Sequence, residues 1–102
     1  MDSEGGKDMT IEKAMRIYRL PGLTTPEDLE CIWSKVLNFG DRVVLAGRHY
    51  NGKNMPEYYG AVYKHLDDNL SCEGKISLMN ASEAIFEDDG HAIEWAIAHS
   101  ME

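Results

Sequence analysis

The chain has 102 residues, of which ten are Lys or Arg and eighteen are Asp or Glu, so its formal net charge at pH 7 is -8. This length corresponds to one domain, and a hydrophobic content of 43% excludes an intrinsically disordered protein. The sequence has no apolar run long enough to cross a membrane, no signal-peptide pattern, and two widely separated cysteines, Cys31 and Cys72, so we expect a cytoplasmic protein with reduced thiols.

The expected organisation is a frayed tail at residues 1–8 followed by a single α+β domain over residues 9–102, because the tail contains nothing to pack. The first expected element is a helix over residues 11–19, with Thr10 as its N-cap. Its apolar face consists of Ile11, Ala14, Met15 and Tyr18. The Leu-Pro-Gly sequence that follows ends the helix.

A second helix is predicted over residues 26–37. Thr25 is its N-cap and Pro26 its first residue, and two acidic residues in the first turn suit the helix dipole. The apolar stripe has helical spacing and consists of Leu29, Ile32, Trp33, Val36 and Leu37. Asn38 and Gly40 both tolerate a positive φ, and we interpret them as the end of the helix.

The middle of the chain favours strands. Residues 42–50 contain two adjacent valines and precede an Asn51-Gly52 turn. Residues 58–66 are rich in Tyr and Val, and the alternation of Tyr59, Ala61, Tyr63 and His65 predicts a second strand. A helix is the alternative here, since Asn54 and Glu57 resemble a capping box, but Gly60 and three tyrosines favour the strand.

The last third adds short elements. We predict a turn at 67–69, a strand at 75–79, a possible further strand at 83–87 and a final helix over 90–100 that is capped by Asp88 or Asp89. The predicted fold is therefore α+β: two N-terminal helices, a short, mostly antiparallel central sheet of three to four strands, and a C-terminal helix.

Charge is unevenly distributed along the chain. Residues 42–66 carry four basic side chains and one acidic side chain, whereas residues 67–102 carry nine acidic side chains and one basic side chain. A surface of net negative charge repels phosphate backbones, so direct DNA binding is not expected. A helix-turn-helix is disfavoured as well, because Glu27, Asp28 and Glu30 would face the major groove.

A basic and aromatic surface is predicted in the middle segment, with the members Arg48, Tyr50, Lys53, Tyr58 and Tyr59. Aromatic and basic side chains on a sheet can stack and clamp single-stranded bases. Simple packing of the tyrosines against the sheet is the favoured interpretation, because Tyr prefers strands in any case.

No catalytic signature occurs in the sequence, and we expect neither catalytic residues nor a cofactor. One alternative is a small-ligand or metal-dependent enzyme in which His91 acts together with Asp88, Asp89 and Glu94. A capping role for the aspartates and a solvated His91 are favoured over this metal site. His49 and His65 share the predicted sheet with no further sign of a catalytic pair.

The leading functional hypothesis is a non-enzymatic protein–protein interaction module. Its contact surface would be an acidic patch formed by Glu83, Glu87, Asp88, Asp89 and Glu94, which would bind a basic surface on a partner protein. Inhibitors from phages, plasmids and toxin–antidote pairs work in this way, some by mimicking nucleic acid. The alternative for this patch is that its charge only keeps the protein in solution.

Overall fold

The computed structural model describes residues 10–33, 35–50, 56–68, 70, 71, 73–83 and 85–100. The elements in this part of the chain are α1 (Ile11–Ile17), β1 (Leu23–Thr24), α2 (Pro26–Ile32), β2 (Lys35–Phe39), β3 (Arg42–Tyr50), β4 (Pro56–His65), β5 (Ile76–Ala81) and α3 (Asp89–His99). The predicted tail at 1–8 and the predicted Asn51-Gly52 turn lie outside the described residues.

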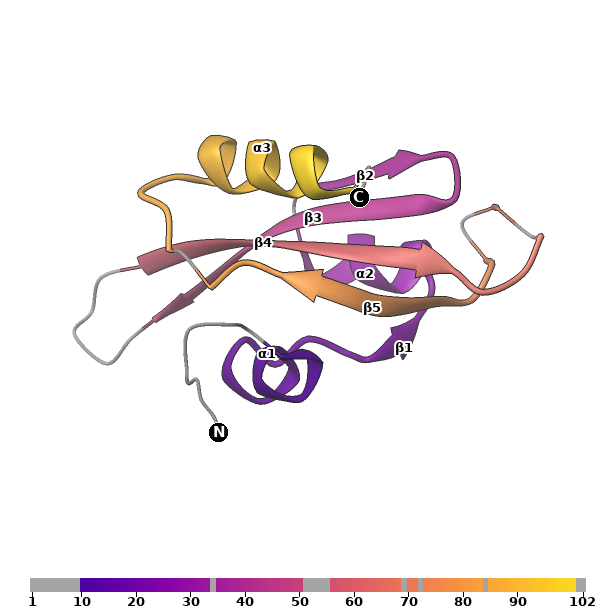
Figure 1. The fold of residues 1–102 in the computed structure, drawn as a ribbon, viewed down its shortest axis with the longest axis horizontal. Helices are drawn as coiled ribbons and strands as arrows, with labels where there is room; N and C mark the ends of the chain where they lie inside the picture. The colour runs from indigo at the N-terminus through magenta and orange to yellow at the C-terminus, as the bar shows by residue number, and fades with distance from the viewer. Residues whose placement is uncertain are drawn as a thin grey trace.

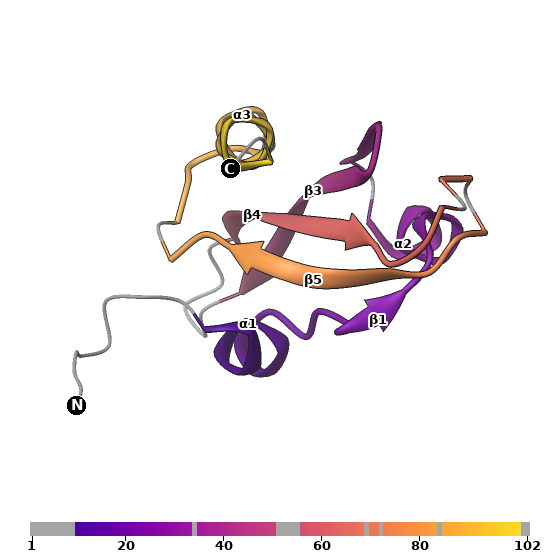
Figure 2. The same ribbon diagram turned by 45° about the vertical axis from the view of Figure 1, so that its right-hand side comes forward.

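The predicted fold class, with two N-terminal helices and three to four strands, is wrong. A curled antiparallel sheet of five strands, in the order β1-β5-β4-β3-β2, dominates the molecule. It carries α1 on one face and α3 on the other (Figures 1 and 2). The main error is the helix predicted over 26–37: α2 ends at Ile32 after seven residues, and the rest of that segment leads into β2 at the edge of the sheet.

Pairing with β3 explains why the second half of that segment is a strand. Val36 pairs with Leu45, and the partly buried Val36 side chain packs against the core from β2. Gly40, with a φ of 60°, and Asp41 form a two-residue turn between the paired residues Phe39 and Arg42. Glycine with positive φ at the first turn position favours a tight hairpin. Gly40 therefore lies in the turn of a β-hairpin and does not end a helix.

Both faces of β3 and β4 are covered, because successive side chains point to opposite sides of the sheet. The larger core lies on the α1 side and contains Ala14, Tyr18, Leu20, Leu29, Val43, Leu45, Tyr59, Ala61, Tyr63, Ile76, Leu78 and Ala81. The smaller core lies on the α3 side, where Val44 and Val62 pack with Ala96 and the flanking Ile93, Trp95 and Ile97. The two central strands thus hold both layers of helix in place.

The strand predicted over 58–66 is confirmed, and its helical alternative is not. Gly60 disfavours a helix, and in the strand its missing side chain leaves room for α3, because a Cβ atom there would stand 2.5 Å from the carbonyl oxygen of Ala92 and 2.8 Å from the Trp95 ring. The glycine lets α3 approach the sheet. Of the residues predicted as a further strand at 83–87, Phe86 makes an isolated bridge to Tyr58.

The helix starts follow their predicted caps. The side chains of Thr10, Thr25 and Asp88 accept hydrogen bonds from the backbone N–H groups of Lys13, Asp28 and His91. Asp88 begins α3, and the hydrogen bond from the His91 backbone lowers the pKa of its carboxyl group. Within the described parts of the chain, no helix is long and apolar enough to cross a membrane.

Candidate functional site

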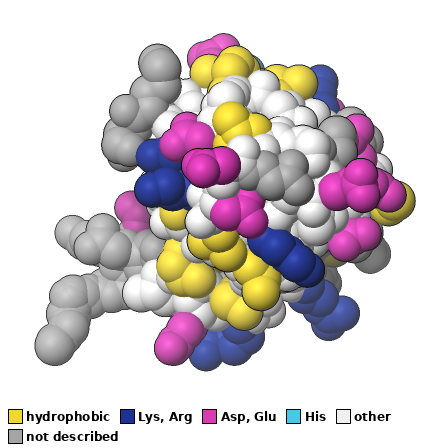
Figure 3. Space-filling model, turned by 90° about the vertical axis from the view of Figure 1, so that its right-hand side faces the viewer, with side chains coloured by type: hydrophobic (Ala, Val, Ile, Leu, Met, Phe, Trp, Pro, Cys, Tyr) yellow, Lys and Arg dark blue, Asp and Glu magenta, His cyan; other side chains and the backbone are white. Residues whose placement is uncertain are grey.

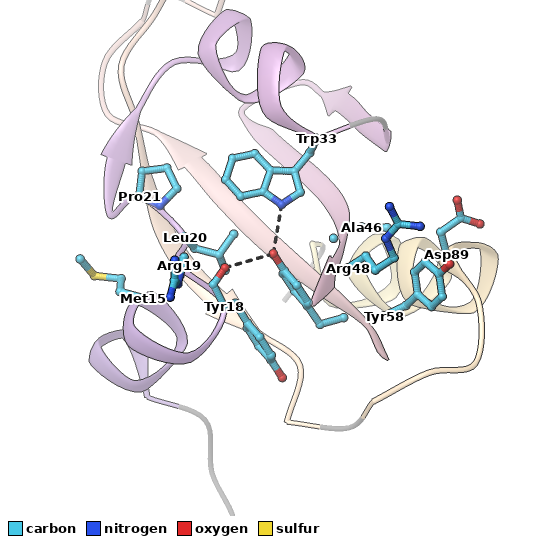
Figure 4. Close-up of a pocket in the computed structure, with 12 residues that line it drawn as sticks. Met15, Tyr18, Arg19, Leu20, Pro21, Trp33, Ala46, Arg48, Tyr58 and Asp89 are labelled. Atoms are coloured by element: carbon cyan, nitrogen blue, oxygen red, sulfur yellow. Dashed lines mark hydrogen bonds between the residues drawn. The ribbon is translucent and has the colours of Figure 1, made fainter. Parts of the chain in front are cut away.

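A cleft of about 890 Å³ lies where β3 extends beyond its neighbour β2. The first residue of β2, Lys35, pairs with Ala46, and among the described residues the rest of β3 pairs only with β4. We call this cavity the edge cleft (Figure 4). Its lining residues are Met15, Tyr18, Arg19, Leu20, Pro21, Trp33, Ala46, Gly47, Arg48, Tyr58, Tyr59 and Asp89.

The floor of the edge cleft is a hydrogen-bonded aromatic pair. Trp33 ends α2 with an extended backbone, and its Nε1–H donates to the hydroxyl of Tyr59 over 3.0 Å. The Tyr59 hydroxyl in turn lies 3.5 Å from the Tyr18 carbonyl oxygen (Figure 4). A Cβ atom at Gly47 would overlap the Tyr59 ring and come within 2.8 Å of Trp33 Nε1. Glycine at position 47 is therefore what allows this pair to form.

The ring of Tyr18 stacks on the ring of Tyr59 in the floor of the cleft. The Tyr18 and Tyr59 rings are parallel within 1° with centroids 3.9 Å apart, and the Tyr18 hydroxyl donates to the Ser82 carbonyl oxygen over 2.8 Å. Burial raises the pKa of Tyr59 to about 12, and burial also raises the pKa of Tyr18. Both phenols therefore stay neutral near pH 7, and the floor remains a set of uncharged hydrogen-bonding groups.

Arg19 stands on the α1 side of the cleft in a strained conformation. Its φ of 58° is the only positive value among the described non-glycine residues. Leu20 is buried in the core, and the Tyr63 hydroxyl donates to the Pro21 carbonyl oxygen over 2.6 Å. These anchors hold the segment after α1 in place and force the strained backbone at Arg19. The exposed Arg19 side chain lines the cleft as a result.

The opposite side of the cleft carries both signs of charge. Arg48 is exposed, with its guanidinium carbon 5.7 Å from the centre of the Tyr50 ring, and Tyr58 is half-buried beside it (Figure 4). Asp89, in the first turn of α3, contributes a half-buried carboxylate that lies 3.9 Å from Lys35 Nζ. The cleft thus offers hydrogen-bond donors from two arginines and an acceptor from one aspartate.

The predicted basic and aromatic surface contributes in part to this site. Arg48 and Tyr58 line the cleft, and Tyr50 is 59% exposed next to Arg48. Tyr59 also lines the cleft, but it does so from the core, since it is only 1% exposed and its side chain points to the α1 face of β4. Lys53 lies outside the described residues.

The predicted acidic patch lies before α3 and along its first half. Glu83, Glu87, Asp88 and Glu94 are exposed, whereas Asp89 is half-buried in the edge cleft. Acidic side chains also occupy the opposite end of the sheet, where Asp67, Asp68 and Glu73 are exposed (Figure 3). Negative charge is therefore spread over the surface, and the patch stays a prediction.

The histidines do not form a metal centre in the described part of the chain. His91 Nδ1 lies 2.8 Å from the Oδ1 atom of Asp88, which also caps α3, and no group of three or more potential ligands occurs among the described residues. His49 pairs with Glu57 across the strands, and its Nε2 lies 3.2 Å from Glu57 Oε1. His65 is buried and lies eight residues after Glu57 in β4. The two sheet histidines are thus too far apart to act together.

Among the cleft residues that were not identified as site residues from the sequence, Trp33, Arg19 and Gly47 matter most for its shape and charge. Trp33 was assigned to the apolar stripe of a helix, Arg19 was the last residue of another, and Gly47 lay inside a predicted strand. A glycine inside a strand is the one signal that pointed to a close approach by another group. The other two come from separate segments, which only the folded chain brings together.

The comparison with known proteins identifies a matching family model but no matching individual protein. No curated protein and no solved structure matches the chain. The family model for nucleotide modification associated domain 4 (Nmad4) matches residues 20–100. This stretch includes Trp33, Gly47, Arg48 and Asp89 from the edge cleft and leaves out only Met15, Tyr18 and Arg19 among the lining residues. Because the match covers most of the chain, the protein belongs to the Nmad4 family.

Proposed function

We propose that this domain is a binding module that holds a single nucleotide in the edge cleft. The observation that carries the proposal is the combination of aromatic and arginine side chains around one cavity. The half-buried rings of Trp33 and Tyr58 offer surfaces on which a base stacks. Arg19 and Arg48 offer charged donors that suit the acceptor atoms of a nucleotide, which include its phosphate oxygens. A volume of about 890 Å³ is typical of sites for small ligands.

The net charge supports a mononucleotide over a long strand. A polynucleotide would meet a protein of net charge -8 over many phosphates, and each would be repelled by the acidic surface. A mononucleotide meets only the local field of Arg19 and Arg48. The family description, which refers to nucleotide modification, supports the same class of ligand. A nucleotide ligand also fits the cytoplasmic location that we expect from the sequence.

Isothermal titration calorimetry with AMP, GMP, CMP and UMP tests this proposal. We expect at least one of them to bind the native protein, and Arg48→Gln and Arg19→Gln to weaken that binding by about tenfold, since a hydrogen bond to a charged group contributes about 1.5–3 kcal/mol. Lys64→Gln is the matched control, because it removes one positive charge from an exposed side chain of β4 that does not line the cleft. No binding by any of the four, or an equal loss in Lys64→Gln, would overturn the proposal.

The acidic interaction surface remains a second proposal. Glu83 and Glu87, before α3, and Glu94, in the middle of α3, are exposed, so they are available to a basic partner protein, as an inhibitor or nucleic-acid mimic would require. Replacing these three with Lys leaves the cleft intact, and it should abolish salt-sensitive binding to a partner captured from the native host. Unchanged binding by the triple variant would rule this surface out as the contact.

A further inference from the structure

Asp89 is an unexpected side chain for a nucleotide site, because its carboxylate repels phosphate. It is the only acidic residue among the described residues that line the edge cleft. The side chain comes from the first turn of an eleven-residue helix whose capping position is already filled by Asp88, so α3 does not require Asp89 as its cap. The carboxylate lies 3.9 Å from Lys35 Nζ and is 46% exposed, so it can also accept hydrogen bonds from a part of the ligand that donates them.

The two ends of the cleft differ in the charged side chains that line them. Arg19 lies on the α1 side, near Met15 and Pro21, whereas Asp89, Arg48 and Tyr58 lie together on the other side (Figure 4). A phosphate group is favoured at the Arg19 end, since no acidic side chain lines the described cleft there. The base then lies at the end that contains Asp89 and Arg48, where the ring of Tyr58 can stack on it.

The side chains at this end match the hydrogen-bonding groups of guanine. Guanine has two adjacent donors, the N1–H and the 2-amino group, which suit the two acceptor oxygens of one carboxylate. It also has two adjacent acceptors, O6 and N7, which suit the planar fork of an arginine. Adenine presents an acceptor at N1, uracil flanks its one N–H with two carbonyl oxygens, and cytosine has a single amino group to offer. Each of these bases would leave Asp89 or Arg48 incompletely paired.

On the basis of the proposed nucleotide-binding function, we propose that the edge cleft selects guanine nucleotides. Asp89 accepts hydrogen bonds from N1–H and the 2-amino group of the base, and Arg48 donates to O6 and N7. Arg19 binds the phosphate. The specificity therefore resides in one aspartate of α3 and one arginine of β3, on two elements that the sheet holds side by side.

Calorimetric titration with GMP, AMP and inosine monophosphate tests this assignment. We expect the native protein to bind GMP at least about tenfold more tightly than AMP, because a bidentate pair of hydrogen bonds discriminates between bases by about this factor. Inosine monophosphate lacks only the 2-amino group, and its affinity should fall between the two. Asp89→Asn should bring GMP affinity down to that of AMP and change AMP affinity by less than about twofold, since an amide offers only one acceptor oxygen.

Glu94→Gln provides the control for charge, because it also removes one carboxylate from α3 but at an exposed position outside the cleft. This variant should keep the native preference for GMP. Equal affinity of the native protein for GMP and AMP would overturn the guanine assignment and leave nucleotide binding intact. A preference that survives Asp89→Asn would equally overturn it, whereas failure of all nucleotides to bind would overturn the proposed function itself.

Discussion

Replacing Gly47 by Ala tests the structure of the cleft floor directly. The new methyl group would overlap the Tyr59 ring and come within 2.8 Å of Trp33 Nε1, and these side chains are held by a hydrogen bond to each other and by the stacked Tyr18. Overpacking of this kind costs about 1–3 kcal/mol. For a domain of this size each kcal/mol lowers the melting temperature by about 4–8 °C. We therefore expect a clear decrease in urea and thermal unfolding experiments.

Gly90→Ala is the matched control. Gly90 lies in the first turn of α3, where an added Cβ would meet only Asp88 Oδ1 at 3.4 Å. Alanine at such a site raises stability by about 0.4–1 kcal/mol, because it restricts the unfolded chain and favours the helix. The same glycine-to-alanine change should thus have opposite signs at positions 47 and 90. Equal shifts in the two variants would refute the close approach at Gly47.

A double-mutant cycle identifies the clashing atom. Tyr59→Phe alone should cost about 1 kcal/mol, since it removes the acceptor of the Trp33 hydrogen bond. In the Gly47→Ala background the same change also removes an atom from the overlap, so it should cost less or become favourable. Additive effects in the urea-derived free energies of unfolding would show that the methyl group does not meet the hydroxyl.

Three further predictions follow from other parts of the fold. Arg19→Gly should raise the free energy of unfolding slightly or leave it unchanged, because relief of the strained φ of 58°, about 1 kcal/mol, offsets the entropy of the glycine, and it should still weaken nucleotide binding. Asp88→Asn should keep the α3 cap. The Asp88 pKa is lowered in the folded state, so the native protein loses stability as the pH falls below 3.8, and the variant should lack this loss. Acid unfolding followed by circular dichroism measures the difference. The Tyr59 phenol, whose pKa is raised from 10 to about 12, should ionise late in an alkaline absorbance titration, and stability should be lost as the pH rises from 10 towards 12.

Local signals in the sequence located several features correctly. The three helix caps follow from single side chains that accept backbone hydrogen bonds, and the alternation of tyrosines in β4 follows from burial on one face. The sequence pattern predicted a helix through Leu37, which is wrong beyond Ile32, because β2 begins at Lys35. Trp33 and Val36 are partly buried against the same core. The apolar pattern therefore identified which side chains are buried, but it gave the wrong backbone conformation.

Composition identified part of the candidate site. Arg48 and Tyr58 were found because basic and aromatic residues are interleaved along β3 and β4, and each faces the cleft. Tyr59 was assigned to the same surface, but neighbouring residues of a strand point to opposite faces, so Tyr59 lines the cleft from the core and is only 1% exposed. Arg19 and Asp89 lie in segments far from β3 in sequence, and their meeting depends on the order of strands and on the docking of α3.

The place where the sequence pattern fails is also the place where the cleft is made. Trp33 leaves the helical conformation, with φ of -109° and ψ of 137°, four residues before the predicted helix would end. That early exit directs the indole towards Tyr59 and starts β2 at Lys35, opposite Ala46. With only five residues, β2 then covers the first half of β3 and leaves Gly47 and Arg48 without a neighbour from that strand. Local preference and final structure disagree most often where a protein builds a functional site, and here one short edge strand produces both the disagreement and the cavity.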